Sequence, residues 1–389
     1  MRIDAIELYH LAIPCIGDLR PYWSISARFE QLPPAPKNWQ TVLVHVRSGD
    51  HAGWGEASPG PLPIDTEEWA AGAFLLLREV IAPALVGQDV LDADHSHRFL
   101  PGILGNALTR AAVDNAIWDL SARQQGLPLA EWITLGSDFD AIRLRATVRV
   151  ENSLDDVMAA VNTAHAAGYG EINLKMLPEQ YEVLRTVRQV FPSLAFSVDC
   201  EGAGRLDQQT DFCRLDDFFL KSLEQPLGVD DLVGHAMLQQ QLRTSICLDQ
   251  TITSRSRWSD VQSLEFCRQI RIEPGRLGGL TQAQFLALDV LSPNNHKVAC
   301  GLSTRPQTAV GQRTSLALAM QDSMEEGPPA LAADYFPGAE LFESDAAPAL
   351  SMERDSESNL VVICPPEPGI GFTPDAAWLK QYVVATAEI

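Results

Sequence analysis

The sequence predicts an α/β chain in which an α+β unit precedes a (β/α)₈-type barrel. From about residue 141 onward, strand-like and helix-like segments alternate, and the candidate strands end at intervals of 24 or 25 residues, at 175, 199, 224, 249 and 273. That interval holds one strand, one helix and two loops, which is the repeat of such a barrel. In the first 130 residues, by contrast, strand patterns precede helical ones, and that order is typical of an α+β unit.

The N-terminal unit is expected to pair a small sheet with amphipathic helices. Its strands are indicated by partial alternation of apolar residues, and its helices by apolar residues at spacings of three and four. The expected strands are 2–11 and 39–46, and the expected helices are 67–82, stopped by Pro83, and 106–124.

The same criteria assign the elements of the barrel, and we expect three parts in the chain. These are an α+β domain over residues 1–130, the barrel over 131–335, and a segment over 336–389 that returns to the first domain. The expected barrel strands are 142–150, 171–176, 195–199, 218–224, 245–249, 270–273 and 297–302, and the expected helices are 153–167, 179–190, 230–241, 257–264 and 280–291.

Composition excludes several classes of partner. A formal net charge of −22, spread along 389 residues, argues against nucleic acid and acidic membranes. No stretch is long and apolar enough to span a bilayer, and the first residues lack the apolar core of a signal peptide. Seven cysteines without CxxC spacing indicate buried thiols in a reducing cytoplasm rather than structural zinc.

Three carboxylates mark the candidate site. Asp199, Glu224 and Asp249 each end a short apolar run, 25 positions apart. If these strands are parallel neighbours, the carboxylates meet at the carboxyl edge of the sheet, where barrels place their ligand sites. Hard oxygen donors without Cys or His suit Mg²⁺, with Mn²⁺ as the alternative ion. Each carboxylate could also be an ordinary polar residue at the end of a strand. That interpretation is less favoured because three carboxylates recur at the same interval.

Lys175 ends the preceding strand, 24 positions before Asp199, in a chain with only five lysines. A lysine that is partly desolvated and close to positive charge can have its pKa lowered enough to act as a general base. Lys175 is therefore the candidate catalytic base, and a salt bridge or surface position is the alternative.

Several motifs carry a resemblance that covers nearly the whole chain. They are GWGEA (53–57), AAVDNAIWDL (111–120), VD (198–199), LEQPL (223–227), ICLD (246–249), PGRLGGL (274–280) and PGIG (368–371). Together they resemble the muconate-lactonizing subgroup of the enolase superfamily, and within it the o-succinylbenzoate synthases and N-acylamino acid racemases.

The resemblance implies a capping α+β domain over a modified TIM barrel, and a homo-oligomer. It implies Mg²⁺ held by Asp199, Glu224 and Asp249, and proton abstraction next to a carboxylate of a small-molecule substrate through an enediolate. Lys175 matches the second lysine of the family's Lys-x-Lys pair. The loops at 14–37 and 53–63 match those that close over the substrate, and Trp23 in the first of them is a candidate to line the pocket or to anchor the loop.

The chain departs from the family in the catalytic shell. Asn173 stands in place of the first lysine of the pair, Glu201 in place of an Asn, and Gln250 in place of a Glu. Arg271 replaces a usual Asn, and we expect it to pair with Glu273.

Glu273 itself occupies the position of the lysine that faces the other side of the substrate. Arg305 lies in an altered segment, 301–311, where it either pairs with a second substrate carboxylate or has a surface role. We assign Asn173, Glu201, Gln250 and Arg271, with Trp23 and Arg305, to the substrate-binding shell.

These departures bear on the reaction. Racemisation needs a proton acceptor on each face of the α-carbon, and Glu273 serves only if its pKa is raised. We therefore expect a one-base β-elimination or dehydration by a lyase. One alternative is an isomerase that acts as a racemase, epimerase or cycloisomerase and uses Lys175 with either Glu273 or a residue of the segment 301–311. The other is a metal-dependent binder of small acids without activity.

Overall fold

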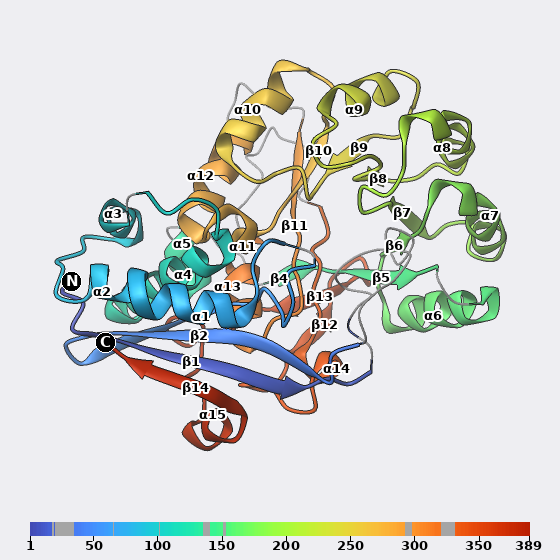
Figure 1. Ribbon diagram of the computed structural model, residues 1–389. Coiled ribbons are helices and arrows are strands. Elements are labelled where there is room, and N and C mark those ends of the chain that lie inside the picture. The colour runs from blue at the N-terminus through green and yellow to red at the C-terminus, as the bar shows by residue number, and fades with distance from the viewer. Residues whose placement is uncertain are drawn as a thin grey trace.

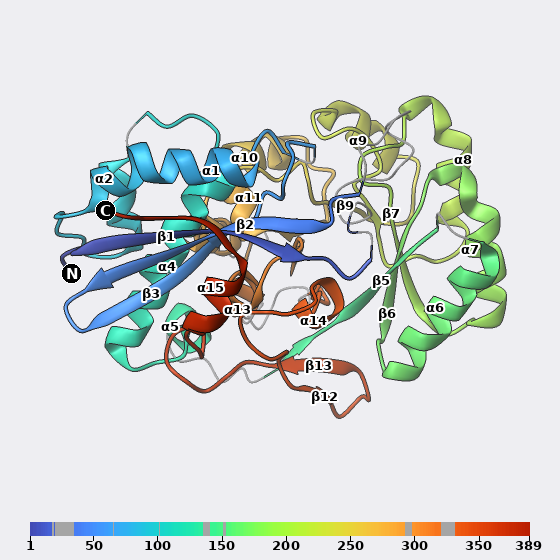
Figure 2. The ribbon, with the colours of Figure 1, turned by 60° about the horizontal axis from the view of Figure 1, so that its bottom comes forward.

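The computed structural model describes residues 1–17, 19, 35–64, 66–100, 102–134, 141–150, 153–291, 298–319 and 331–389. Two bodies lie side by side: a sheet with helices built from both ends of the chain, and a ring of parallel strands with helices outside (Figures 1 and 2). The α/β fold with a modified barrel and an α+β capping domain is confirmed.

The capping sheet is antiparallel, in the order β14-β1-β2-β3. One face packs on helices α1 and α4 through an apolar cluster that includes Ile6, Val44, Phe74 and Ile117. Because β14 pairs with β1, the C-terminal segment completes the sheet that the N-terminal residues begin. The strands are β1 Ala5–Pro14, β2 Asn38–Ser48, β3 His51–Ala57 and β14 Val383–Glu388, and the helices are α1 Ala70–Leu76, α2 Ala82–Leu85, α3 Ala93–Ser96, α4 Ala107–Gln125, α5 Leu129–Thr134 and α15 Ala376–Tyr382.

The GWGEA motif brings β3 close to α4. A Cβ atom on Gly55 would lie 1.9 Å from the carbonyl oxygen of Ala112, and one on Gly53 would lie 2.2 Å from that of Ala116. Both obstacles are backbone atoms, which side-chain rearrangement does not remove. The two glycines are therefore needed for this strand to pack on this helix.

The expectation that the first helix stops before Pro83 is wrong. A π-helical turn, Leu77–Ile81, follows α1, and Pro83 lies in the first turn of α2. The backbone stays helical from the π turn into α2, so the proline is accommodated directly after the wider π-helical turn rather than at a free helix start. The helix consequently ends at Leu85.

The barrel sheet has seven strands in the order β11-β10-β9-β8-β7-β6-β5, and its pairings are parallel. This confirms that the periodic strands are parallel neighbours. The strand expected over 218–224 is reduced to its last two residues. The strands are β5 Arg145–Arg149, β6 Glu171–Lys175, β7 Ala195–Asp199, β8 Leu223–Glu224, β9 Ile246–Leu248, β10 Gln269–Ile272 and β11 Ala299–Leu302.

An irregular segment, residues 331–334, joins the two edges of this sheet. On one side the amide of Asp334 donates to the carbonyl oxygen of Leu302 at 3.3 Å, and on the other the amide of Arg145 donates to the carbonyl oxygen of Ala333 at 3.1 Å. The segment therefore occupies the eighth strand position, between β11 and β5.

The barrel helices lie outside the ring of strands (Figure 2). Sequence periodicity anticipated α6, α7, α9, α10 and α12 but not α8, α11, α13 or α14. A small sheet, β12-β13-β4, flanks the barrel. The helices are α6 Leu154–Ala167, α7 Tyr181–Val190, α8 Gln209–Asp216, α9 Leu232–Gln239, α10 Arg255–Ser263, α11 Pro274–Leu277, α12 Leu280–Leu291, α13 Ala309–Ala319 and α14 Gly338–Leu341, and the flanking strands are β4 Ala141–Arg143, β12 Met352–Arg354 and β13 Leu360–Ile363.

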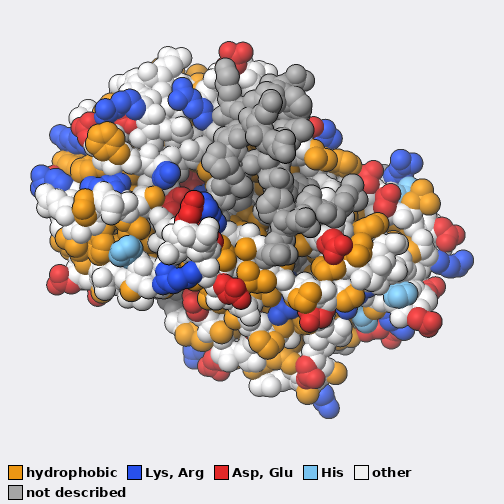
Figure 3. All heavy atoms as spheres, turned by 180° about the vertical axis from the view of Figure 1, so that it is seen from behind, with side chains coloured by type: hydrophobic (Ala, Val, Ile, Leu, Met, Phe, Trp, Pro, Cys, Tyr) orange, Lys and Arg blue, Asp and Glu red, His pale blue; other side chains and the backbone are white. Residues whose placement is uncertain are grey.

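The surface agrees with a chain whose charge is dispersed. Acidic and basic side chains are interspersed over the face in Figure 3. Within the described ranges, none of the helices has the length and apolar character needed to cross a bilayer.

Candidate active site

The three strand-end carboxylates lie together at one end of the barrel. Asp199 is the last residue of β7, Glu224 is the last of β8 directly opposite it, and Asp249 follows β9. Their exposed fractions are 2%, 1% and 4%. All three line one small cavity of about 40 Å³, together with Lys175 and Glu273.

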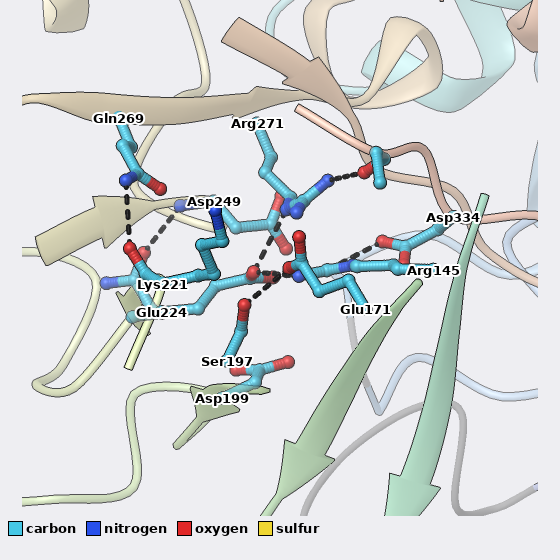
Figure 4. Close-up of polar contacts among 12 residues, drawn as sticks. Arg145, Glu171, Ser197, Asp199, Lys221, Glu224, Asp249, Gln269, Arg271 and Asp334 are labelled. Atoms are coloured by element: carbon cyan, nitrogen blue, oxygen red, sulfur yellow. Dashed lines mark hydrogen bonds and ion pairs between the residues drawn. The ribbon is translucent and has the colours of Figure 1, made fainter. Parts of the chain in front are cut away.

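Glu224 is bound by two arginines (Figure 4). Arg145 donates to both of its oxygens, from Nη1 to Oε2 at 2.6 Å and from Nη2 to Oε1 at 3.0 Å. Arg271 donates from Nε to Oε2 at 3.0 Å. Burial alone raises the pKa of a carboxyl group, but these guanidinium groups outweigh it and hold the pKa of Glu224 at about 2.

Arg145 in turn binds Asp334, the last residue of the irregular closing segment. Its Nε donates to Oδ1 at 2.7 Å and its Nη2 to Oδ2 at 2.9 Å. Arg271 donates from Nη1 to the carbonyl oxygens of Leu302 and Ala332. The result is a buried chain of alternating charge, Asp334–Arg145–Glu224–Arg271, that crosses the barrel (Figure 4).

The expected Arg271–Glu273 ion pair is wrong, because Arg271 points to Glu224. Glu273 is bound instead by Arg305, at 2.5 Å from Nε to Oε1, and by Arg276, at 2.7 Å from Nη2 to Oε2. Burial raises the pKa of Glu273, but Arg305 and Arg276 outweigh this effect and keep it below its ordinary value. Glu273 is thus an ionised, fully engaged carboxylate.

Lys175 is paired with two carboxylates. Its Nζ donates to Oε1 of Glu201 and lies 3.6 Å from Oδ2 of Asp199. Burial lowers the pKa of Lys175, but these neighbours raise it by more, so it lies above its ordinary value. The lowered pKa expected for a general base is therefore not what these residues produce by themselves.

The other assigned residues differ in their relation to the cavity. Glu201, Gln250 and Arg305 line it, whereas Asn173 is fully buried on β6 and is not among its lining residues. The side-chain oxygen and nitrogen of Asn173 have no hydrogen-bond partner among the described residues. Trp23 lies outside the described residues.

Comparison with known proteins agrees with this architecture. Residues 156–378 match the enolase C-terminal domain-like family, and residues 35–134 match the N-terminal domain of mandelate racemase and muconate lactonizing enzyme. The chain belongs to the enolase superfamily. It is therefore a member of a family of enzymes.

Two of the named relatives carry out different reactions, as their names indicate. An o-succinylbenzoate synthase of Listeria innocua serovar 6a is 30% identical over 355 residues, which cover 91% of each chain. An N-succinylamino acid racemase of Thermus thermophilus is 33% identical over 280 residues, 72% of this chain and 73% of that one. The crystal structure of a superfamily member from Listeria innocua Clip11262 superposes with a TM-score of 0.86 at 27% identity, covering 100% of this chain and 99% of the other.

Sequence reasoning missed Arg145, although a signal was present. Arg145, Thr147 and Arg149 alternate with Ala146 and Val148 along β5, so two arginines fall on one face of the first barrel strand. Asp334 gave no such signal because its segment has no periodic pattern.

The donor set of this superfamily member fits a hard divalent cation. Burial and the nearby Glu224 raise the pKa of Asp199 to about 8, and burial raises that of Asp249 above its ordinary value, so both lack full compensation of negative charge. Around the same cavity, Oε2 of Glu201 and Oε1 of Gln250 are buried acceptors without a donor in the described part of the chain. Oxygen atoms of this kind are what Mg²⁺ prefers.

The cationic side chains nevertheless occupy much of this donor set. In the described ranges, no group of three acidic, His or Cys side chains stands ready to hold a metal ion. Lys175 lies beside Asp199, Arg276 donates to Oδ1 of Asp249, and two arginines bind Glu224. A cation at this site therefore has to share each carboxylate with a positive side chain.

Proposed function

We propose that this chain removes the α-proton of a small carboxylate substrate through an enediolate, in a Mg²⁺-dependent, one-base β-elimination or dehydration. The observation that carries the one-base assignment is the state of Glu273. Both of its oxygens are bound by arginine, and its pKa is lowered. A carboxylate held ionised in this way is a poor proton acceptor and cannot act as the second base of a racemase.

The base that we propose is Lys175. It lines the same cavity as Glu273 and comes from β6, on the other side of the three carboxylates in the strand order. The two carboxylates that pair with the ammonium group of Lys175, Glu201 and Asp199, are themselves at the site. A metal ion bound next to Asp199 would weaken the attraction between these carboxylates and the ammonium group of Lys175. It would thereby lower the pKa of Lys175 toward the value that a base requires.

We propose that Asp199, Glu224 and Asp249 hold the metal. When bound there, Mg²⁺ would bind the substrate carboxylate and stabilise the charge that develops on it. Glu201 and Gln250 would border the substrate, since each presents a buried oxygen beside the cavity. Arg305 would keep Glu273 ionised and so hold the opposite wall in place.

Support for the substrate class comes from the relatives. One is named an o-succinylbenzoate synthase, which indicates a lyase, and another an N-succinylamino acid racemase, which indicates an isomerase. We place this chain with the lyases because of the engaged Glu273. We also propose a cytoplasmic homo-oligomer, and the seven free cysteines agree with a reducing compartment.

Hydrogen–deuterium exchange tests the proposal. The wild type and the variants Lys175→Ala and Lys221→Ala would be followed by NMR in D₂O with Mg²⁺, on N-succinylamino acids, dipeptides and the o-succinylbenzoate precursor. Lys221 is an exposed lysine outside the cavity and serves as the matched control. We expect exchange on one enantiomer with retention, at least about 100-fold slower in Lys175→Ala and unchanged in Lys221→Ala.

Two results would contradict it. Interconversion of both enantiomers at similar rates would show two bases and favour the isomerase. Wild-type metal binding without exchange on any acid would favour a binding protein.

A further inference from the structure

The pair of arginines on Glu224 limits how that residue can bind a metal ion. An ionised carboxylate has about four lone-pair positions, two on each oxygen. Arg145 and Arg271 together take both positions on Oε2, and Arg145 takes one on Oε1. A single position on Oε1 is left for another partner. Glu224 can therefore bind a cation through one oxygen only.

The two arginines differ in what they hold. Arg145 is shared almost symmetrically between Glu224 and Asp334, so its charge is balanced on both sides (Figure 4). Within the described residues, Arg271 has Glu224 as its one carboxylate partner, and its Nη1 donates to two carbonyl oxygens at 3.2 and 2.7 Å. It is 1% exposed, so water does not screen its charge.

Those carbonyl contacts also prevent Arg271 from moving away. Its Nε reaches Glu224 while its Nη1 is fixed to Leu302, at the end of β11, and to Ala332, in the closing segment. A cation bound to Oε1 of Glu224 consequently has an immobile guanidinium close by. Like charges at such short range in a buried site repel strongly.

We propose that Arg271 is a positioning residue that restricts Glu224 to binding through one oxygen and, through its fixed charge, sets a weak affinity for the metal ion. This inference rests on the proposed metal-dependent function. It predicts that removal of the positive charge, with a hydrogen-bond donor to Glu224 retained, strengthens metal binding.

The test measures Mn²⁺ binding directly, by electron paramagnetic resonance of the free ion and by calorimetry, without substrate. The variants are Arg271→Gln, which is neutral, Arg271→Lys, which keeps the charge, and Arg243→Gln, which removes an arginine whose side chain is 68% exposed. We expect Arg271→Gln to bind Mn²⁺ at least about tenfold more tightly than the wild type. Arg271→Lys and Arg243→Gln should stay within about twofold.

A second variant covers the case in which Arg271→Gln does not fold. Asp334→Asn is nearly isosteric and removes the carboxylate that shares Arg145 with Glu224. Arg145 then acts on Glu224 alone, so Mn²⁺ should bind at least about threefold more weakly.

The outcomes separate the two proposals. Mn²⁺ binding by the wild type that Arg271→Gln leaves unchanged or weakens would overturn the role of Arg271 and leave the proposed function standing. Tighter binding by Asp334→Asn would overturn it as well. Failure of the wild type and of every folded variant to bind millimolar Mn²⁺ would overturn the proposed metal site itself.

Discussion

Arg305 donates to both carboxylate oxygens of Glu273, from Nε to Oε1 at 2.5 Å and from Nη2 to Oε2 at 3.1 Å. The planar, two-point geometry of this contact is the strongest form of a side-chain ion pair. It places a fixed, ionised pair on the wall of the cavity where a second base would have to act.

Replacement of Glu273 by Gln should therefore lower the stability of the fold without abolishing proton exchange. The change leaves Arg305 and Arg276 without a charged partner at this position, so we expect a loss of about 3 kcal/mol in the free energy of unfolding. Exchange that depends on Lys175 should stay within about tenfold of the wild-type rate, because Glu273 takes no proton. Urea unfolding and NMR exchange measure the two effects.

Glu182→Gln is the matched control for stability, because Glu182 pairs with Arg185 at the surface, where both side chains are more than half exposed. It should cost less than about 1 kcal/mol. Complete loss of exchange in a folded Glu273→Gln protein would show that Glu273 is catalytic.

The buried chain across the barrel makes a second prediction. Arg145→Met should lower the free energy of unfolding by about 3–5 kcal/mol, because it leaves Asp334 buried without its cation. Arg185→Met, at the pair with Glu182 in which both side chains are more than half exposed, should cost less than about 1 kcal/mol. Chemical denaturation gives both values, and equal losses would show that the buried chain adds little to stability.

The contact of β3 with α4 gives a third prediction. Gly55→Ala should destabilise the protein by about 3 kcal/mol or more, because the new methyl group meets the backbone of Ala112, which cannot move without the helix. Gly228→Ala is the control, since nothing lies within 4 Å of its added Cβ. Thermal unfolding should show a large decrease in Tm for the first variant and little change for the second.

The pH dependence of stability gives a fourth prediction. Burial raises the pKa of Glu56 to about 7, against the hydrogen bonds it accepts from Thr308, Thr41 and Gly311. Because the folded state holds this proton more tightly, Glu56 contributes stability below the unfolded pKa of about 4.5, and that contribution is lost as the pH rises to about 7.

The measurement compares wild type with Glu56→Gln by urea unfolding at pH 5 and pH 7.5. The free energy of unfolding of the wild type, relative to the variant, should fall by about 2 kcal/mol over that range. The same comparison with Glu353→Gln, at an exposed position, should give no such change. A difference that is constant with pH, or rises with it, would contradict a raised pKa.

Sequence period accounts for what could be predicted of the fold. The recurrence of strand ends at Asp199, Glu224 and Asp249 placed three carboxylates at one edge of the sheet, because parallel strands of equal repeat end in register. Period placed the end of β8 at Glu224 but overestimated its length, because the strand expected over 218–224 has only two residues.

Sequence period could not predict which charged side chains pair with one another. Arg271 is only two positions from Glu273 in the sequence, yet it pairs with Glu224, which is 47 positions away. That choice depends on which side chains meet inside a closed ring of strands, and local spacing does not encode it. Arg145 was detectable by alternation, but its partner Asp334 follows an irregular backbone that has no sequence pattern.

The segment that occupies the eighth strand position has a consequence for the order of events during synthesis. Arg145 opens the barrel sheet, while the carboxylate that shares its charge is 189 residues later in the chain. A ribosome that has released all seven sheet strands has still not supplied the piece that closes the ring. Closure is therefore a late step, and the nascent barrel exposes two strand edges until residues 331–334 emerge.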